Sequence, residues 1–174
     1  MHPYEPFVGV LLLPGHAAFA RTAPVTLPDG QPVAQIRWPA LSMTHRFDIL
    51  DAFGDAELAV GRKGFWGRSY QITGLDGDVL LGLKPSWWFP IGRSVITLPG
   101  GQRLTTKGNW TGRRFKVRDG SGSPVARLAT TNRAFSLRQD SVAFEMTAPV
   151  LSIVQAVGLA ECVRVAVRAQ QSSG

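Results

Sequence analysis

Basic side chains are the residues of this sequence best suited to chemistry, and the chemistry that they suit is anion binding. They occur at expected strand ends and turns in the middle of the chain, where neighbouring hairpins can bring them to one rim. Lys and Arg clusters bind phosphorylated headgroups through charge-assisted hydrogen bonds. The alternative is an ordinary solvated exterior. The candidate anion-binding residues are Arg62, Lys63, Arg68, Arg103, Lys107, Arg113 and Arg114.

A second candidate surface is aromatic. The run Trp87-Trp88-Phe89 follows Lys84-Pro85, which places it in a loop or at the start of a strand. Because successive side chains of a strand point to opposite faces, the two tryptophans cannot both face the core. One of the two tryptophans is therefore expected to be exposed, which makes Trp87, Trp88 and Phe89 candidate contacts with a lipid interface or a partner protein. Packing in the core or at the barrel mouth is the alternative.

The sequence lacks the groupings that catalysis or metal binding would need. His2, His16 and His45 stand at no metal-ligand spacing with one another or with a cysteine. Cys162 lies in an apolar segment, where cysteine behaves as a small hydrophobic residue. We therefore expect no enzymatic activity, no catalytic residue, no cofactor and no metal site.

Length and composition favour one globular domain. The 174 residues are 44% hydrophobic and 18% charged, which suits a folded chain with a sizeable core. A single cysteine excludes an intramolecular disulfide framework. The net charge of +7 is compatible with an anionic partner and says nothing about the fold. Arginine outnumbers lysine, which hints at a bacterial genome of high GC content.

Alternating apolar and polar residues, interrupted by glycine-containing turns, predict five β-hairpins. Asp-Gly and Gly-Gly supply the positive φ that hairpin turns require. A further strand pair, 134–138 and 141–146, brings the estimate to about twelve strands. Segment 1–20 is either a tail or a first strand. The five hairpins span residues 25–36, 47–60, 70–81, 95–104 and 115–128.

Five aspartates are expected to flank these turns. An aspartate in a turn accepts hydrogen bonds from nearby backbone N–H groups. A weak calcium site among the five is the alternative interpretation. They are Asp48, Asp51, Asp55, Asp76 and Asp78.

Residues 148–169 predict a helix that is apolar on all sides, with Thr147 as its N-cap. Such a helix is buried either in a protein core or in lipid. A barrel of eleven or twelve strands leaves a lumen that a helix can fill. Glu161, with Arg164 and Arg168 on the same side, favours this arrangement over a membrane span. The predicted fold is mainly β: a closed antiparallel barrel of about twelve strands around a buried C-terminal helix.

The strand–turn–strand stretches 108–127 and 140–146, followed by the helix, resemble the tubby C-terminal-like superfamily. This superfamily includes the LURP-one-related proteins and the phospholipid scramblases. Residues 47–83 are similar to its first repeat, and the resemblance covers about residues 20–170. It implies a twelve-stranded barrel around a hydrophobic helix. The barrel domain is expected to span residues 21–170, with 171–174 as a tail.

The resemblance also implies functions. Tubby-like members bind phosphoinositides through basic side chains on the barrel exterior, and scramblases are linked to phospholipid movement. No stretch here matches the tubby phosphoinositide site residue by residue, and the acidic calcium segment and Cys-rich run of scramblases are missing. We expect a cytoplasmic, tubby-like binding module that can lie at the membrane periphery. Its partner is an anionic phospholipid or a protein, and nucleic acid is a weaker expectation. The alternatives are a scramblase-like protein whose helix acts in the bilayer, and a structural barrel with no small ligand.

Overall fold

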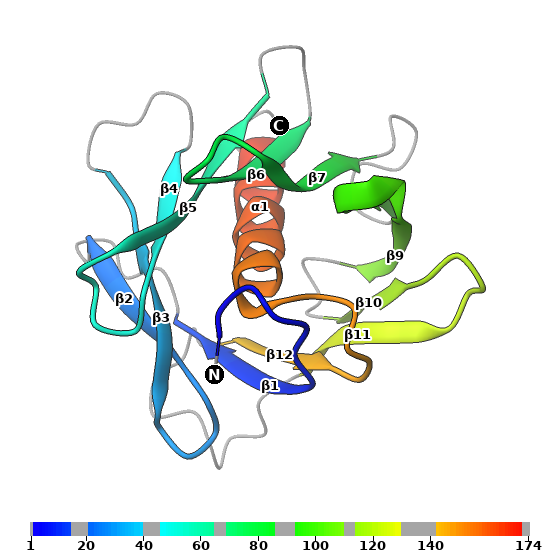
Figure 1. The fold of residues 1–174 in the computed structure, drawn as a ribbon. Helices are drawn as coiled ribbons and strands as arrows, with labels where there is room; N and C mark the ends of the chain where they lie inside the picture. Colours follow the sequence, from blue (N-terminus) through cyan, green and yellow to red (C-terminus); the bar gives the residue numbers. More distant parts are fainter. Residues whose placement is uncertain are drawn as a thin grey trace.

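Twelve antiparallel strands close into a barrel around one helix, as the sequence predicts (Figure 1). The computed structural model describes residues 2–14, 21–39, 46–64, 69–85, 93–109, 114–129 and 142–171. The strands are β1 (Gly9–Leu13), β2 (Thr22–Thr26), β3 (Pro32–Arg37), β4 (Phe47–Leu50), β5 (Glu57–Lys63), β6 (Tyr70–Gly74), β7 (Val79–Pro85), β8 (Arg93–Thr97), β9 (Arg103–Asn109), β10 (Arg114–Arg118), β11 (Pro124–Ala129) and β12 (Val142–Met146).

The first strand closes the barrel. Strands that follow one another in the chain pair in space, and β1 pairs with both β2 and β12. From the sequence, the N-terminal segment could be either a tail or a first strand. In the structure it contributes a strand, which lies between the first and last strands of the remaining meander. The expected strand 134–138 lies outside the described residues, and β11 pairs directly with β12.

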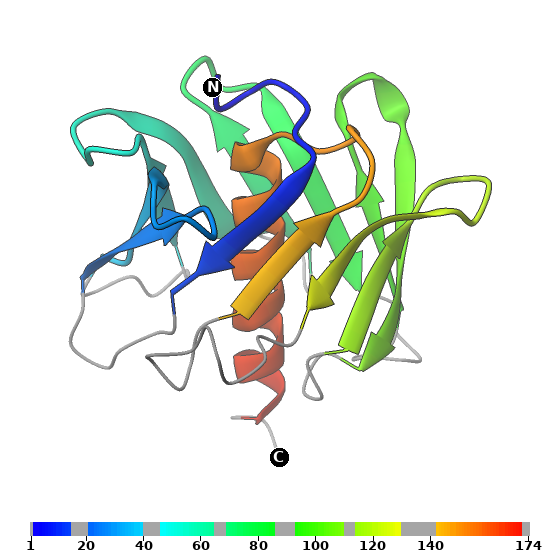
Figure 2. The same ribbon diagram turned by 90° about the horizontal axis from the view of Figure 1, so that it is seen from below.

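The five predicted hairpins all turn at the same end of the barrel, which we call the turn end. Their turns lie between β2 and β3, β4 and β5, β6 and β7, β8 and β9, and β10 and β11. Gly30 and Gly77 have φ of 88° and 89°, as the Asp-Gly turns require. The helix starts near this end and runs lengthwise through the barrel to the opposite end, which we call the far end (Figure 2).

The turn between β10 and β11 depends on one carboxylate. Asp119 Oδ1 accepts hydrogen bonds from the backbone N–H groups of Ser121 and Ser123, each at 2.9 Å, and from the Ser121 hydroxyl at 2.6 Å. The bond from the Ser121 hydroxyl, followed by the backbone bonds, holds the pKa of Asp119 below its usual value of 3.8.

This lowered pKa predicts a pH-dependent contribution of Asp119 to stability. A carboxylate with a lowered folded-state pKa stabilises the fold above its ordinary pKa, and this contribution disappears as the pH falls through the folded value. We expect Asp119→Ala to lower the melting temperature at pH 7, and the difference from the wild type to shrink as the pH falls below 3.8. Circular dichroism melts across a pH series measure this, and a difference independent of pH would contradict it.

The helix α1 (Ile153–Gln171) begins five residues later than the sequence predicted. Its N-cap is Ser152, whose hydroxyl accepts a hydrogen bond from the Gln155 N–H, while the Gln155 side chain accepts one from the Ser152 N–H. This reciprocal pair is a capping box. The prediction of Thr147 as the N-cap was wrong, because the helix begins only at Ile153. The Thr147 hydroxyl instead donates to the Pro124 carbonyl at 3.1 Å.

The N-terminal segment packs across the start of α1. The Phe7 N–H donates to the Leu151 carbonyl at 2.9 Å. The Val154 N–H, in the first turn of the helix, donates to the Pro3 carbonyl at 3.2 Å. The first turn of a helix leaves N–H groups without partners inside the helix, and this contact satisfies one of them.

From Ile153 to Val163 the helix is buried on all sides apart from the partly buried Gln155, which explains why this part lacks a polar face. It lies closest to β5, β6 and β7, and Gly158 permits this approach because a Cβ there would lie 2.7 Å from Ile72 Cγ1. On the other side of the lumen, the Phe115 and Phe144 rings pack at 6.0 Å between centroids. Cys162 is buried as expected, and this burial raises the pKa of its thiol.

A buried ion pair joins the helix to the barrel near the far end. Glu161 is 1% exposed and accepts hydrogen bonds from Arg164 Nη1 at 2.7 Å and from Trp38 Nε1 at 3.2 Å. Arg164 Nη1 also donates to the Pro14 carbonyl at 2.6 Å. Glu161 and Arg164, which the sequence places on the same side of the helix, pair at i,i+3 spacing. A scramblase-like helix in the bilayer required Glu161 to lie outside such a barrel, and this burial disagrees with it.

Within the described part of the chain, no helix combines the length and the apolar character that a membrane crossing demands.

Candidate functional site

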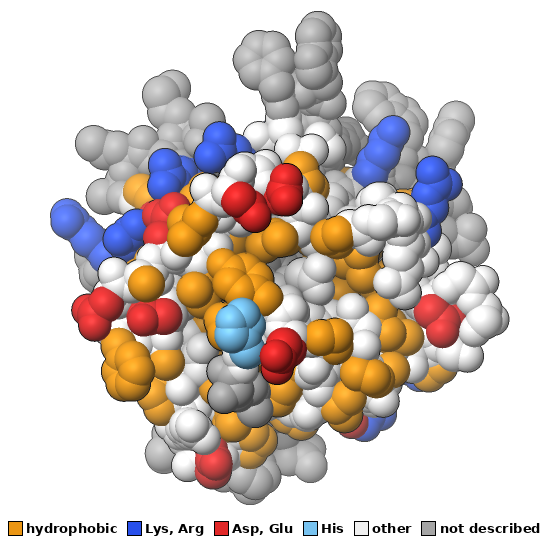
Figure 3. Space-filling view, viewed as in Figure 1, with side chains coloured by type: hydrophobic (Ala, Val, Ile, Leu, Met, Phe, Trp, Pro, Cys, Tyr) orange, Lys and Arg blue, Asp and Glu red, His pale blue; other side chains and the backbone are white. Residues whose placement is uncertain are grey.

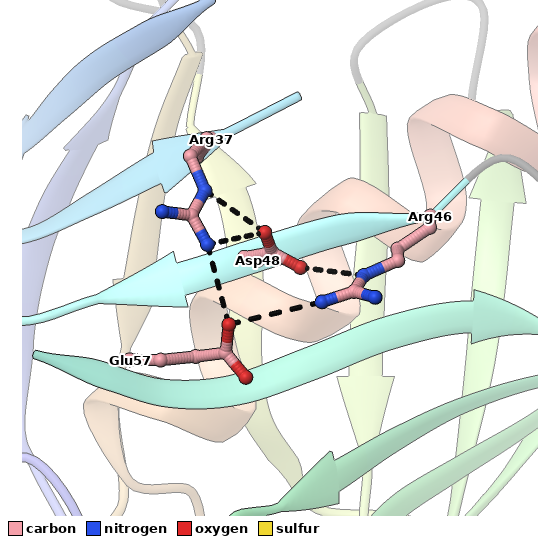
Figure 4. A network of polar contacts seen from close by, with 4 residues as sticks. All are labelled: Arg37, Arg46, Asp48 and Glu57. Atoms are coloured by element: carbon pink, nitrogen blue, oxygen red, sulfur yellow. Dashed lines mark hydrogen bonds and ion pairs between the residues drawn. The ribbon is translucent and has the colours of Figure 1, made fainter. Parts of the chain in front are cut away.

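Two arginines on the outer face of β3 to β5 are neutralised by acids. Arg37 donates to Asp48 Oδ2 through Nε at 2.9 Å and through Nη2 at 2.7 Å, and Arg46 Nε donates to Asp48 Oδ1 at 2.8 Å (Figure 4). Glu57 completes the network, 3.3 Å from Arg37 and 3.8 Å from Arg46. The two positive and two negative charges balance, so this network is not a candidate anion site.

The prediction that Asp48 flanks a turn was wrong. Asp48 lies inside β4, directly opposite Arg37 of β3, and is 2% exposed. Its neighbours Phe47 and Ile49 fill the core, so Asp48 points outward, where the two guanidinium groups bind it. Burying a carboxylate is costly unless it is paired and hydrogen-bonded, as Asp48 is here.

A cross-strand pair neutralises a third cation. Arg127 of β11 lies opposite Glu145 of β12, and their side chains meet at 2.6 Å. The hydrogen bond from Arg127 to Glu145, together with the attraction between their charges, raises the pKa of Arg127.

Unpaired cations gather on a cationic wall, formed by the five neighbouring strands β6 to β10. These strands contain no Asp or Glu. The exposed cations Lys84, Arg103, Lys107 and Lys116 have no ion-pair partner among the described residues. Lys107 and Lys116 lie directly opposite each other, an arrangement that costs stability because like charges repel. The Lys and Arg residues of these strands are Lys84, Arg93, Arg103, Lys107, Arg114, Lys116 and Arg118.

This wall contributes to a strong charge imbalance along the sequence. Residues 93–174 contain twelve Lys and Arg residues and four acids, a net charge of +8. Residues 1–92 contain seven and eight, a net charge of −1. The excess charge of the chain therefore belongs to its second half, which contains three of the five strands of the wall.

The structure divides the predicted anion-binding residues between two regions. Arg103 and Lys107 lie on the wall, at opposite ends of β9, and Arg114 begins β10. Arg62 and Lys63 end β5, beside the wall. Arg68, Arg113 and the aromatic candidates Trp87, Trp88 and Phe89 lie outside the described residues.

Lys84 and Lys116 are wall residues that the sequence prediction missed. Lys107 and Lys116 are equally distant from the connection 110–113, so a hairpin centred there places them opposite each other. That symmetry was the available signal. Lys84 offered no comparable signal, because its place on the wall depends on pairing between β7 and β8.

The turn end has the opposite character. Figure 3 shows hydrophobic side chains at its centre with acidic side chains around them, and Lys and Arg only toward its edge. Phe53 and Leu75, on neighbouring turns, are 81% and 67% exposed. The aspartates of the turns at this end are Asp29, Asp51, Asp55, Asp76, Asp78 and Asp119.

Among the residues that the structure describes, no three His, Cys, Asp or Glu side chains come close enough together to bind a metal ion. The aspartates Asp51 and Asp76 instead bond to the backbone of their own turns, where their Oδ1 atoms accept hydrogen bonds from Asp55 and Asp78.

Comparison with known proteins shows that a solved structure shares the fold of this chain. The X-ray structure of an Arabidopsis thaliana protein, AT5G01750, superposes with a TM-score of 0.61 and 15% sequence identity, over 97% of this chain and 94% of that one. The likeness is one of fold. AT5G01750 has the tubby-like fold of LURP-one-related proteins, so the resemblance seen in the sequence is supported as a distant fold relationship. No protein-family profile and no curated protein matches the chain.

Proposed function

We propose that this chain is a non-enzymatic binding module that binds anionic phospholipid surfaces through its cationic wall. One observation carries the proposal: five neighbouring strands contain no acid, and three of them, β7, β9 and β10, present exposed cations. Elsewhere on the barrel, Arg37, Arg46 and Arg127 are each paired with a carboxylate. An anionic surface against the wall would supply the countercharge that these strands lack.

Simple electrostatics gives the size of the effect. A Lys or Arg near an anionic leaflet contributes about 1 kcal/mol of binding free energy. The opposed pair Lys107 and Lys116 also gains relief from its mutual repulsion when anions approach. Because these side chains are exposed, dissolved salt screens their attraction to the anionic surface, and the screening length is about 10 Å at 0.1 M salt. Binding through the wall must therefore weaken with salt.

The test is co-sedimentation with phosphatidylcholine vesicles that do or do not contain phosphatidylglycerol, at several salt concentrations. We expect salt-sensitive binding only to the anionic vesicles. Lys107→Glu changes the charge of the wall by two units. It should weaken binding to the anionic vesicles by about 2 kcal/mol, roughly 30-fold.

Arg21→Glu is the matched control. It makes the same charge change at an exposed residue beside β2, six strands from β8 on the opposite side of the barrel. It should change vesicle binding little. No sedimentation of the wild type, or equal weakening by both variants, would contradict a role for this wall.

A protein partner at the turn end is the second candidate, favoured by the exposed Phe53 and Leu75 on neighbouring turns. Such a patch, bordered by aspartates, suits a partner with apolar and basic residues. If the wild type binds no vesicle, pull-down experiments that compare it with Phe53→Ser become the next test.

A further inference from the structure

A hollow of about 330 Å³ opens on the cationic wall around Gly82 of β7. Leu81 and Leu83, on either side of Gly82, are buried in the core. Gly82 therefore occupies an outward-facing position, where any other residue would place a side chain. The hollow is bordered by Gln71, Lys84 and Thr97, and Val79 and Leu98 contribute apolar surface.

Neither backbone nor packing requires glycine at this position. The φ of Gly82 lies outside the left-handed region, and a Cβ there would meet only the Thr97 carbonyl, at 4.0 Å. Gly61 differs, because a Cβ there would lie 2.1 Å from the Phe47 ring. Glycine inside a strand weakens the strand and often marks a place where a ligand approaches the backbone closely. What this glycine provides is the open space.

Polar side chains surround that space in register. Arg62, Gln71, Gly82, Thr97 and Arg103 form one continuous row across β5 to β9. Neighbouring strands lie about 4.8 Å apart, so each arginine lies about 10 Å along the row from Gly82.

These side chains are free to meet a ligand. Lys84 is two residues beyond Gly82 and faces the same side of β7. Arg62, Gln71, Lys84, Thr97 and Arg103 are exposed, and none has a side-chain partner among the described residues. Lys84 and two neutral hydrogen-bonding groups, Gln71 and Thr97, therefore line the hollow, and Arg62 and Arg103 lie further out at the two ends of the row.

We infer that the Gly82 hollow binds the phosphate ester of a polyol. Lys84 matches the phosphate charge, and the Gln71 amide and the Thr97 hydroxyl match hydroxyl groups. Arg62 and Arg103, at the two ends of the row, add to the positive potential at the hollow. A volume near 300 Å³ is at the lower end of small-ligand sites. The inference deepens the proposed function, since a lipid headgroup and a soluble polyol phosphate share this chemistry.

Gly82→Leu tests the inference, because it fills the hollow without a clash. Two vesicle preparations of equal charge serve as probes, one with phosphatidylglycerol, whose headgroup is a polyol, and one with phosphatidylserine. Glycerol 1-phosphate, titrated into the protein by calorimetry, is the soluble probe. The wild type should prefer phosphatidylglycerol at least fivefold. Gly82→Leu should lose this preference and bind glycerol 1-phosphate at least fivefold more weakly, yet keep salt-sensitive binding to both vesicles.

Two further variants make the result specific. Gly120→Leu, in a turn where a Cβ meets nothing within 4 Å, should leave the preference unchanged. Lys84→Met, which removes charge but keeps a long side chain, should weaken glycerol 1-phosphate binding. Melting temperatures of Gly82→Leu at or above the wild-type value show that the barrel is intact.

The outcomes separate the two proposals. Vesicle binding in which Gly82→Leu keeps the full phosphatidylglycerol preference would overturn the hollow and leave the wall standing. Glycerol 1-phosphate binding that Gly82→Leu abolishes, without any vesicle binding, would support the hollow as a soluble-ligand site and reject the lipid surface. Failure of the wild type to bind any of the three probes would overturn both.

Discussion

Gly158→Leu is expected to destabilise the barrel by about 3 kcal/mol, because a closed lumen cannot make room for the new side chain. A Cβ at this position would lie 2.7 Å from Ile72 Cγ1 and 2.8 Å from Ile72 Cδ1. Leucine favours a helix over glycine by almost 1 kcal/mol, which does not offset this clash. The free energy of unfolding, measured by urea titration, gives the effect.

A matched glycine and a compensating substitution test the explanation. Gly82→Leu makes the same chemical change on the outer wall and should be neutral or stabilising. Ile72→Ala removes the atoms that clash, so the double variant with Gly158→Leu should be less destabilised than the two single effects added together. Strict additivity would show that contact with Ile72 is not the cause.

Glu161→Ala should cost about 3 to 5 kcal/mol of unfolding free energy, because it removes the acceptor at a buried ion pair. The Arg164 guanidinium and the Trp38 indole N–H both donate to this carboxylate. Arg164 Nη2 is already buried without a partner among the described residues, so the loss leaves the guanidinium still less satisfied. Urea titration of the variant measures the cost.

The neighbouring arginine provides the control. Arg164→Ala alone removes a cation that bonds to the buried Glu161 carboxylate at 2.7 Å. If the pair acts as a unit, the double variant should be less destabilised than the sum of the two single variants. An additive result, or a loss below 1 kcal/mol for Glu161→Ala, would show that the buried pair contributes little.

Local signals in the sequence predicted the architecture well. The Asp-Gly turns at Gly30 and Gly77 and the alternation around them fix strand pairs that are close in sequence, and the structure confirms them. The start of α1 was predicted wrongly because Thr147 and Ser152 are both good N-caps. Contacts between the N-terminal segment and residues 151–154, far away in sequence, accompany the later start.

The candidate site was less predictable, because it depends on register across several strands. Lys107 and Lys116 belong to one hairpin and could be aligned from sequence. Arg62 and Arg103 share a row only through three intervening strands. The neutralisation of Arg37 and Arg46 was equally hidden, since Asp48 was interpreted as a turn residue. Composition counts charges, but only the fold shows which of them are paired.

The order of elements along the chain has a consequence for synthesis. The buried residues 153–163 of α1 fill the lumen, yet they follow the twelve strands of the barrel, and the closing pair joins β1 to β12. On the ribosome every strand therefore emerges before the helix that will cover its inner face. Leu11, Ile36 and Ile72, which are wholly buried in the finished barrel, stay uncovered until then. Contacts between distant parts of a chain form slowly, and exposed apolar strands aggregate. Nascent chains that stall before residue 153 should therefore depend on chaperones far more than the completed barrel does.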